Sequence, residues 1–322
     1  MTERRALALG LCMALAACGD NLRPSVFDDP TQELPATLAE LGIAWGEPAP
    51  APWFAFAPSW PLWSSGSAKD RLAFVPAPID TTVADAWQFP IGTLFAKTFS
   101  YPLAGARQPV ETRILRRTGD GWTYDVYLWA SDGSGATKIA LDTSVVVELA
   151  DDGGAPFTHR VPGRLDCRTC HESAAVPALG FSEIQLDAAL LAALDAEGLR
   201  SVPSATPARI EHADPATRDV LGLFQGNCVH CHNGGAGVSA SFDLRHGVAL
   251  AAIIDQPTAS SASAAGIRVV PGSPGTSILF LAVSGETADP AVKPMPPLGI
   301  DRRDAGAIER LRAWIVALPA TN

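Results

Sequence analysis

Two short strings combine cysteine and histidine at a spacing that suits a porphyrin. They are Cys167-Arg168-Thr169-Cys170-His171 and Cys228-Val229-His230-Cys231-His232. In a C-x-x-C-H string the two thiols add across the two vinyl groups of one haem, and the next histidine is the proximal ligand of the iron. We therefore expect two covalently bound haem c groups. The residues expected to hold them are Cys167, Cys170 and His171 for the first haem, and Cys228, Cys231 and His232 for the second.

Three other uses of the four cysteines have to be weighed. Two C-x-x-C pairs could bind one zinc ion, a C-x-x-C pair could be a thioredoxin-like redox site, or the cysteines could form two disulfides in an exported chain. A thioredoxin-like site needs a βαβ context that the sequence lacks. None of the three explains a histidine directly after both pairs, so haem attachment is the preferred interpretation.

Met295 is the candidate sixth ligand of the second haem. It lies in the proline-rich string Lys293-Pro294-Met295-Pro296-Pro297, and Met1 and Met13 are expected to leave with a signal peptide. Prolines restrict the backbone, so the thioether could be presented to the iron at little entropic cost. The alternative is that Met295 fills a gap in a core. His232 and Met295 together would give a haem of raised potential.

The residues around the second motif predict short helices and turns. Asp214-Pro215 is a good helix start, and the helix that follows delivers the motif. A turn is expected at Pro271-Gly272-Ser273-Pro274, with a short helix at 277–283 after it. A closing helix at about 303–318 has apolar residues at spacings of three and four. In this order the stretch 205–322 resembles the class I-like cytochrome c domain, which implies a helical haem-binding fold.

An antiparallel β unit is predicted before the first motif. The segments 93–100, 111–116, 124–129 and 144–149 are rich in β-branched and aromatic residues, and Gly119-Asp120-Gly121 is a turn between two of them. A helix is expected at about 182–197. The aromatic residues Trp53, Phe54, Phe56, Trp60 and Trp63 are expected to cover the sheet or a haem edge, and a binding surface is the alternative.

Several strings along the mature chain resemble a family of uncharacterised bacterial dihaem c-type cytochrome lipoproteins. They are Pro61-Leu62-Trp63-Ser64, Lys69-Asp70-Arg71, Phe89-Pro90-Ile91-Gly92-Thr93, Lys97-Thr98-Phe99, Glu111-Thr112-Arg113, Leu179-Gly180 with Gln185-Leu186, and the two C-x-x-C-H motifs. The resemblance implies an architecture and no agreed activity.

The sixth ligand of the first haem is not determined by the motif. His159, eight residues before Cys167, is the preferred candidate because its segment could fold over the ring. His212 and an open, exchangeable site are the alternatives, and His246 fits better as a surface or propionate-side residue. We expect His230 to face solvent. The iron ligands predicted from the sequence are thus His171, His232, Met295 and His159.

The N-terminus reads as a bacterial export signal. Arg4 and Arg5 precede an apolar stretch, and Leu15-Ala16-Ala17-Cys18 resembles a lipobox, which implies acylation of Cys18. An ordinary secretory signal is the alternative. The expected organisation follows from these features. It has residues 1–18 as signal peptide, 19–50 as tether and lead-in, 51–158 as β-rich domain, 159–204 as first haem-binding segment and 205–322 as cytochrome c-like domain.

Composition narrows the possible partners. The chain has a net charge of −10 and no basic run, which argues against nucleic acid and against binding of an anionic membrane surface. We expect attachment to a bacterial membrane through the lipid alone, on the periplasmic side or at the outer membrane. Redox proteins are the expected partners.

The sequence therefore predicts an α+β fold, an N-terminal antiparallel β-rich domain followed by a mainly helical cytochrome c-type region, and a role in electron transfer. A dihaem peroxidase or oxidase with one open haem is the alternative. It is disfavoured because the motifs lie only 61 residues apart, from Cys167 to Cys228. A ligand- or surface-binding role of the β unit is neither supported nor excluded.

Overall fold

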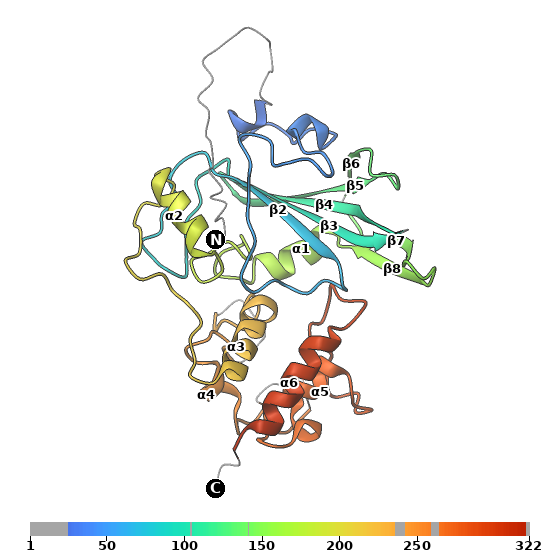
Figure 1. The fold of residues 1–322 in the computed structure, drawn as a ribbon, viewed down its shortest axis with the longest axis vertical. Helices are drawn as coiled ribbons and strands as arrows, with labels where there is room; N and C mark the ends of the chain where they lie inside the picture. The colour runs from blue at the N-terminus through green and yellow to red at the C-terminus, as the bar shows by residue number, and fades with distance from the viewer. Residues whose placement is uncertain (1–24, 104, 141, 236–241, 259–263, 320–322) are drawn as a thin grey trace, which may run out of the picture.

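A computed structural model describes residues 25–103, 105–140, 142–235, 242–258 and 264–319 of the chain. The β strands form the upper part in Figure 1, and helices α3 to α6 lie below it. The main sheet is antiparallel with the order β1-β2-β3-β4-β5-β6, and a second, two-stranded sheet is formed by β7 and β8. The strands are β1 Phe54–Ala55, β2 Ala68–Phe74, β3 Leu94–Leu103, β4 Ala106–Thr118, β5 Gly121–Trp129, β6 Ala136–Ile139, β7 Val145–Ala150 and β8 Pro156–Val161.

Both faces of the main sheet are buried. Side chains alternate between the faces of a strand, so Leu94 and Ala96 join one core cluster and Phe95 joins the other. The first cluster is completed by the chain before the sheet, with Phe27 and Leu38 among its buried residues. Residues 25–50, expected to be a lead-in, therefore supply part of the core.

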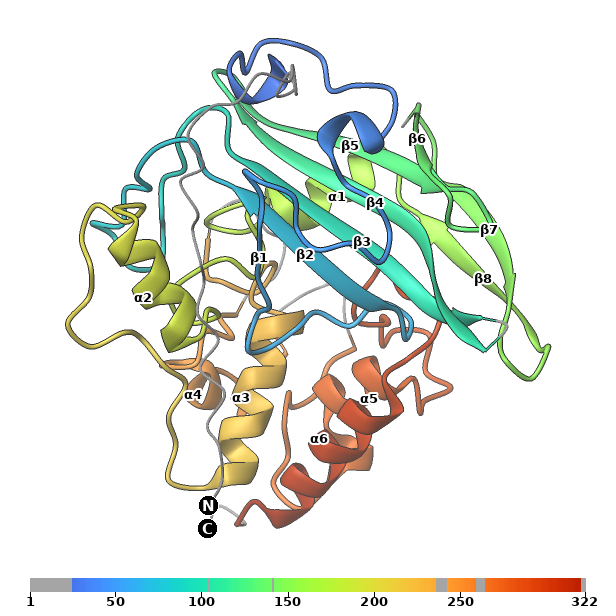
Figure 2. The ribbon, with the colours of Figure 1, turned by 45° about the horizontal axis from the view of Figure 1, so that its top comes forward.

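The opposite face of the sheet is covered by the segment that carries the first motif. Cys167 of α1 (Arg164–His171) and Leu191 of α2 (Ala188–Ala196) pack there with Phe181. Figure 2 shows α1 directly behind β4 and β5, and α2 beside the edge near β1. The predicted helix at 182–197 is shorter because the Asp187 side chain accepts a hydrogen bond from the Leu190 amide and starts α2 there.

Four helices follow in the lower part of the molecule. They are α3 Pro215–Asn227, α4 Ala249–Ile253, α5 Ile278–Ser284 and α6 Ala305–Ala317. Asp214 caps α3 as predicted, through its carboxylate and the amides of Ala216 and Thr217. α3 packs against α6, where Trp314 Nε1 donates to Thr217 Oγ1 at 3.0 Å. The predicted helices at 277–283 and 303–318 are confirmed as α5 and α6.

The predicted mainly helical cytochrome c-type region is wrong. Helices account for 22% of the chain and strands for 25%, and the described residues form an open, mostly antiparallel β-rich fold with no helical cytochrome c region. The physical reason lies between α3 and α6. Glycine and proline turns such as Pro271-Gly272-Ser273-Pro274 leave room for helices of only five and seven residues there.

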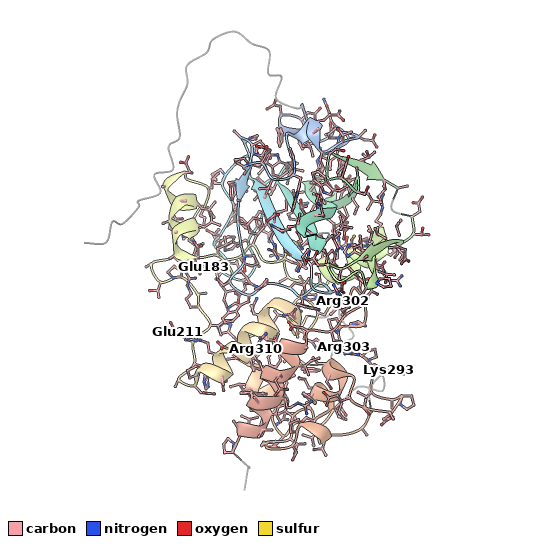
Figure 3. The ribbon with its side chains drawn as sticks, turned by 45° about the vertical axis from the view of Figure 1, so that its right-hand side comes forward. Glu183, Glu211, Lys293, Arg302, Arg303 and Arg310 are labelled. Carbon is pink, nitrogen blue, oxygen red and sulfur yellow. The ribbon has the colours of Figure 1, made fainter. Side chains whose placement is uncertain are left out.

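Two tryptophans and an arginine join the upper and lower parts. Trp60 packs on Gly222 of α3, and the Trp63 amide donates to Asn227 Oδ1 at 2.7 Å. Arg302, labelled in Figure 3 where the two parts meet, donates to the Ser65 carbonyl oxygen and lies over the Phe157 ring of β8. These contacts join the β-rich upper part of the molecule to its helical lower part.

Gly222→Ala should destabilise the protein, although alanine favours helices. A Cβ atom at Gly222 would lie 2.2 Å from Cε3 of Trp60, and such overpacking costs about 1–3 kcal/mol. Gly306→Ala in α6 is the matched control, since its nearest neighbours lie at 3.4 Å. We expect it to be neutral or stabilising by up to ~1 kcal/mol. Urea unfolding measures both, and equal stabilities of the two variants would contradict the close contact.

Candidate functional site

Helix α1 positions the first C-x-x-C-H motif against the sheet. Cys167, Cys170 and His171 are separated by three and four residues on this helix, a spacing that places side chains on one face. The Asp166 carboxylate accepts hydrogen bonds from the Ser144 hydroxyl and the Gly163 amide and so fixes the start of α1 beside β7. Cys167 is buried.

His171 is oriented for metal binding through one ring nitrogen. Its Nδ1 lies 2.6 Å from the carbonyl oxygen of Pro177, so Nδ1–H donates and the lone pair is left on Nε2. An N–H bonded in this way fixes the tautomer of a ligand histidine. Burial, followed by the charge of Lys97, lowers the pKa of His171 to about 3. The ring is therefore neutral at pH 7, which is the form that binds iron.

The second motif follows the end of α3. The helix ends at Asn227, and the amides of Cys231 and His232 both bond to the Cys228 carbonyl oxygen, which makes a tight turn through the motif. The His232 ring packs against the Phe242 ring at a tilt of 41°, with 4.4 Å between the ring centres. His232 Nδ1 is buried without a hydrogen bond of normal geometry among the described residues.

The predicted ligands of the second haem line one cavity. Cys228, Cys231, His232 and Met295 border a space of about 370 Å³ whose walls include Phe224. Met295 is held there by its amide, which donates to the Ala282 carbonyl oxygen at 3.0 Å. The fold thus brings Met295 to the second motif from 63 positions further along the chain. This donor set of two thiols, an imidazole and a thioether fits an iron porphyrin, which the two cysteines would attach and whose iron His232 and Met295 would hold.

The two motifs are neighbours in space. Cys170 of the first motif lines the same cavity as Cys231 of the second. Asn233 Nδ2 donates to the Ser173 carbonyl oxygen at 2.8 Å and ties together the chain that follows each motif. Burial, together with the nearby Cys231 thiolate, raises the pKa of Cys170 to about 11.

A second cavity of about 440 Å³ lies beside the first motif. Its walls come from the sheet, the chain at 172–182 and the end of α3, and they include Lys97 and His230. His230 also lines the first cavity, so the expectation that it faces solvent is wrong. A smaller space is lined by His171, Cys167 and Lys97 together. The first motif therefore opens on to space bounded by the sheet.

His159 is not placed to bind the first iron. On strand β8 it is buried, its Nδ1 lies 2.9 Å from the Tyr101 hydroxyl and its Nε2 lies 2.7 Å from Glu111 Oε1. With both ring nitrogens engaged, the structure argues against the predicted ligation. His212 is exposed and bonds to the Asp214 amide, while His246 lines the larger cavity.

Glu111 is the centre of a buried polar network. It contacts His159 and receives two hydrogen bonds from Arg113, one of them from Nε to Oε2 at 3.0 Å. Burial raises the pKa of Glu111, but the Arg113 charge and the His159 hydrogen bond outweigh it and lower the pKa to about 2. The carboxylate therefore stays ionised and compensates the Arg113 charge.

A row of cations that was not predicted from the sequence lies on the face of the sheet that packs against Cys167. Arg71 pairs with Lys97 across β2 and β3, and Lys97 pairs with Arg113 across β3 and β4. Burial and then the charges of Arg71 and Arg113 lower the pKa of Lys97 to about 7, and burial lowers the pKa of Arg71 to about 10. The alternation of side chains along a strand could have indicated this row, because all three cations lie at strand positions that share a face with Phe95.

The alternatives for the cysteines find no support in the described residues. Cys167, Cys170, Cys228 and Cys231 are free thiols. Within 25–319, apart from its undescribed gaps, no group of three or more His, Cys, Asp or Glu is placed to hold a metal ion. In the same part of the chain no helix is long and apolar enough to cross a membrane. Cys18, the predicted lipidation site, lies outside the described residues.

Comparisons with protein-family models, with curated proteins and with solved structures find no match to this chain.

Glu111→Gln should lower the free energy of unfolding by about 3–5 kcal/mol at pH 7, because it leaves Arg113 buried without a counter-charge. Since the folded pKa of Glu111 lies below its ordinary value of 4.5, its contribution is present above pH 4.5 and is lost as the pH falls toward 2. The gap between wild type and variant should shrink over that range in urea unfolding. Glu148→Gln, at an exposed position of β7, should be neutral throughout.

Proposed function

We propose that this chain is an exported dihaem c-type protein that transfers electrons. The observation that carries the proposal is that His232 and Met295 line one cavity and that Cys170 of the other motif lines it too. The chain offers the residues for two iron centres side by side, as a one-electron relay requires. Haem c, when bound, supplies an iron that alternates between Fe(III) and Fe(II).

The four thiols have the attachment role. Each would add its S–H across one vinyl group, with the sulfur bonded to one carbon and the hydrogen delivered to the other, so that no oxidant or reductant is consumed. Burial raises the pKa of the Cys167 thiol above its ordinary value and raises that of Cys228 to about 12. These thiols are poor nucleophiles in the folded protein, so attachment belongs before or during folding.

The two proximal histidines have matching roles with different supports. His171 is fixed by the Pro177 carbonyl oxygen, whereas the His232 ring packs at a tilt against the Phe242 ring. Hydrogen bonding of Nδ1–H raises the basicity of a ligand imidazole, and His171 has such a bond to Pro177. We expect Met295 to complete the second site with a thioether that favours the reduced state.

Export and anchoring complete the proposal. The lipobox-like string ending at Cys18 supports a lipid anchor on the periplasmic side or at the outer membrane. The net charge of −10 favours a redox partner with a basic docking face. Membrane contact then depends on the lipid rather than on the folded chain.

A dihaem peroxidase or oxidase is a second candidate, favoured by one observation. Both ring nitrogens of His159 are engaged, which leaves the sixth position of the first iron without its predicted ligand. An open first iron would bind carbon monoxide in the reduced protein, whereas two six-coordinate irons would not. Turnover of peroxide by the haem-loaded protein separates the enzyme from the carrier.

Replacing the second pair of cysteines should remove one haem. A Cys228→Ser, Cys231→Ser double variant is expected to retain one covalent haem per chain, against two in the wild type, measured by haem staining and mass spectrometry. The matching double variant at Cys167 and Cys170 should also retain one. Wild-type protein from a host competent in cytochrome c maturation that carries no covalent haem would overturn the proposal.

Met295→Ala should convert the second haem to a high-spin form that binds carbon monoxide, and should lower its midpoint potential by on the order of 0.1 V. The control is Leu298→Ala, at another residue that lines the same cavity but carries no donor atom. Optical spectra and a redox titration give the result. An unchanged low-spin spectrum in Met295→Ala would exclude this residue as ligand.

A further inference from the structure

A row of three cationic side chains on the main sheet has too few negatively charged neighbours to balance its charge. We call it the cation row. The row consists of Arg71, Lys97 and Arg113, which are direct partners across three adjacent strands. Neighbouring strands lie about 4.8 Å apart, so the row spans about 10 Å. It lies on the face of the sheet that packs against Cys167.

Among the residues that the structure describes, only one of the three cations has a carboxylate partner. Arg113 is bound by Glu111, which also accepts the hydrogen bond of His159. Within the same residues, the one side-chain hydrogen bond of Arg71 reaches the Lys69 carbonyl oxygen at 3.4 Å, although Arg71 is only 8% exposed.

The positive charge of Lys97 is compensated even less than that of Arg71. Among the residues that the structure describes, Lys97 Nζ has no hydrogen bond or ion pair, and it lies 5.9 Å from the centre of the Phe99 ring. A largely buried charge without a partner is unfavourable. In the described part of the chain, Arg71 and Lys97 therefore lack an anion.

The other charged groups near the row are engaged elsewhere. Lys69, on the same face, donates from Nζ to the Leu62 carbonyl oxygen at 2.8 Å. Asp70 points to the other face and pairs with Arg107. Glu172 and Asp85 line the cavity beside the row, but Glu172 is held by Arg168 and the charge of Asp85 acts on Arg245. His230 and His246, which also line this cavity, supply no negative charge.

We infer that Arg71 and Lys97 bind the two propionate carboxylates of the first haem. Both side chains line the cavity beside the first motif, and both also line the small space that is bordered by His171 and Cys167. Two carboxylates would supply the negative charge that Arg71 and Lys97 lack among the described residues. The inference rests on the proposed covalent haem at Cys167 and Cys170, and it adds a binding role for residues of the sheet.

The row has a length and a direction that suit this role. Its Arg113 end lies near the first motif, since the Arg113 charge acts on the thiols of both Cys167 and Cys170. Its Arg71 end lies two strands away. The propionates of a haem lie on the side of the ring opposite its thioether bonds, so a porphyrin attached at α1 would extend along the row toward Arg71.

The test compares two substitutions of Lys97 in the haem-loaded full chain. Lys97→Arg keeps the positive charge and can hold a carboxylate, whereas a guanidinium cannot lose its proton to ligate iron. Lys97→Met removes the charge and keeps a similar length. Lys69→Met is the matched control, because Lys69 lies on the same face with carbonyl partners of its own.

The readout is the midpoint potential of the first haem, from a spectroscopic redox titration. Loss of a nearby cation disfavours the reduced haem, so Lys97→Met should shift the reduction equilibrium tenfold or more toward the oxidised form, which is 59 mV for one electron. Lys97→Arg and Lys69→Met should stay within twofold of the wild type. Arg71→Met should reproduce the shift of Lys97→Met.

Each other outcome overturns the inference in a distinguishable way. If Lys97→Arg makes the first haem high-spin and able to bind carbon monoxide, Lys97 is an iron ligand instead. If added inorganic phosphate shifts the wild-type potential but not that of Lys97→Met, the cations bind free anions. Wild-type potentials in folded Lys97→Met and Arg71→Met place the propionates elsewhere. A wild type without covalent haem defeats the proposed function itself.

Discussion

The alternation of side chains along β3 and β4 governs the arrangement of this protein. Successive residues of a strand face opposite sides, so Ala96 and Ile114 face the lead-in cluster while Phe95 and Leu115 face α1 and the segments around it. The same alternation places Lys97 and Arg113 toward the first motif. A shift of one residue in the pairing of the two strands would bury these cations among aliphatic side chains and turn apolar residues toward the cavity. The register of this one hairpin thus sets the core and the site together.

The lower part of the molecule depends on the upper part for its shape. The strand order leaves the chain at 58–65 free to run along α3, where Trp60 lies on Gly222 and the Trp63 amide bonds to Asn227. The same stretch meets Arg302 through Ser65. The second motif is therefore enclosed partly by the segment between β1 and β2, since Trp63 lines its cavity. These contacts tie the chain between β1 and β2 to α3 and to the segment before α6.

The sequence was informative where short-range chemistry decides the outcome. Asp214-Pro215 starts a helix and Gly119 lies in the turn between β4 and β5, each for a reason contained in a few neighbouring residues. Contacts between residues that are distant in the sequence could not be predicted from it. His159 was an attractive ligand by position, but Tyr101 and Glu111 from other strands engage its nitrogens. The prediction of a mainly helical region was wrong because the apolar spacing of α3 and α6 carries no information about the turns between them. The cation row could be recognised only from the strand pairing, since Arg71, Lys97 and Arg113 are distant in sequence.

The burial of Cys167 bears on the order in which the chain would fold and be modified. The sheet is encoded before the motif, so during synthesis and export β1 to β6 emerge before residue 167 does. Cys167 packs among Phe89, Phe95 and Leu115, so attachment of the proposed haem to this sulfur would require it to be exposed first. On that proposal, one apolar face of the sheet would stay uncovered until α1 had been modified. Such a face invites association with other chains, so the interval before attachment would be the one in which the chain is most vulnerable to aggregation.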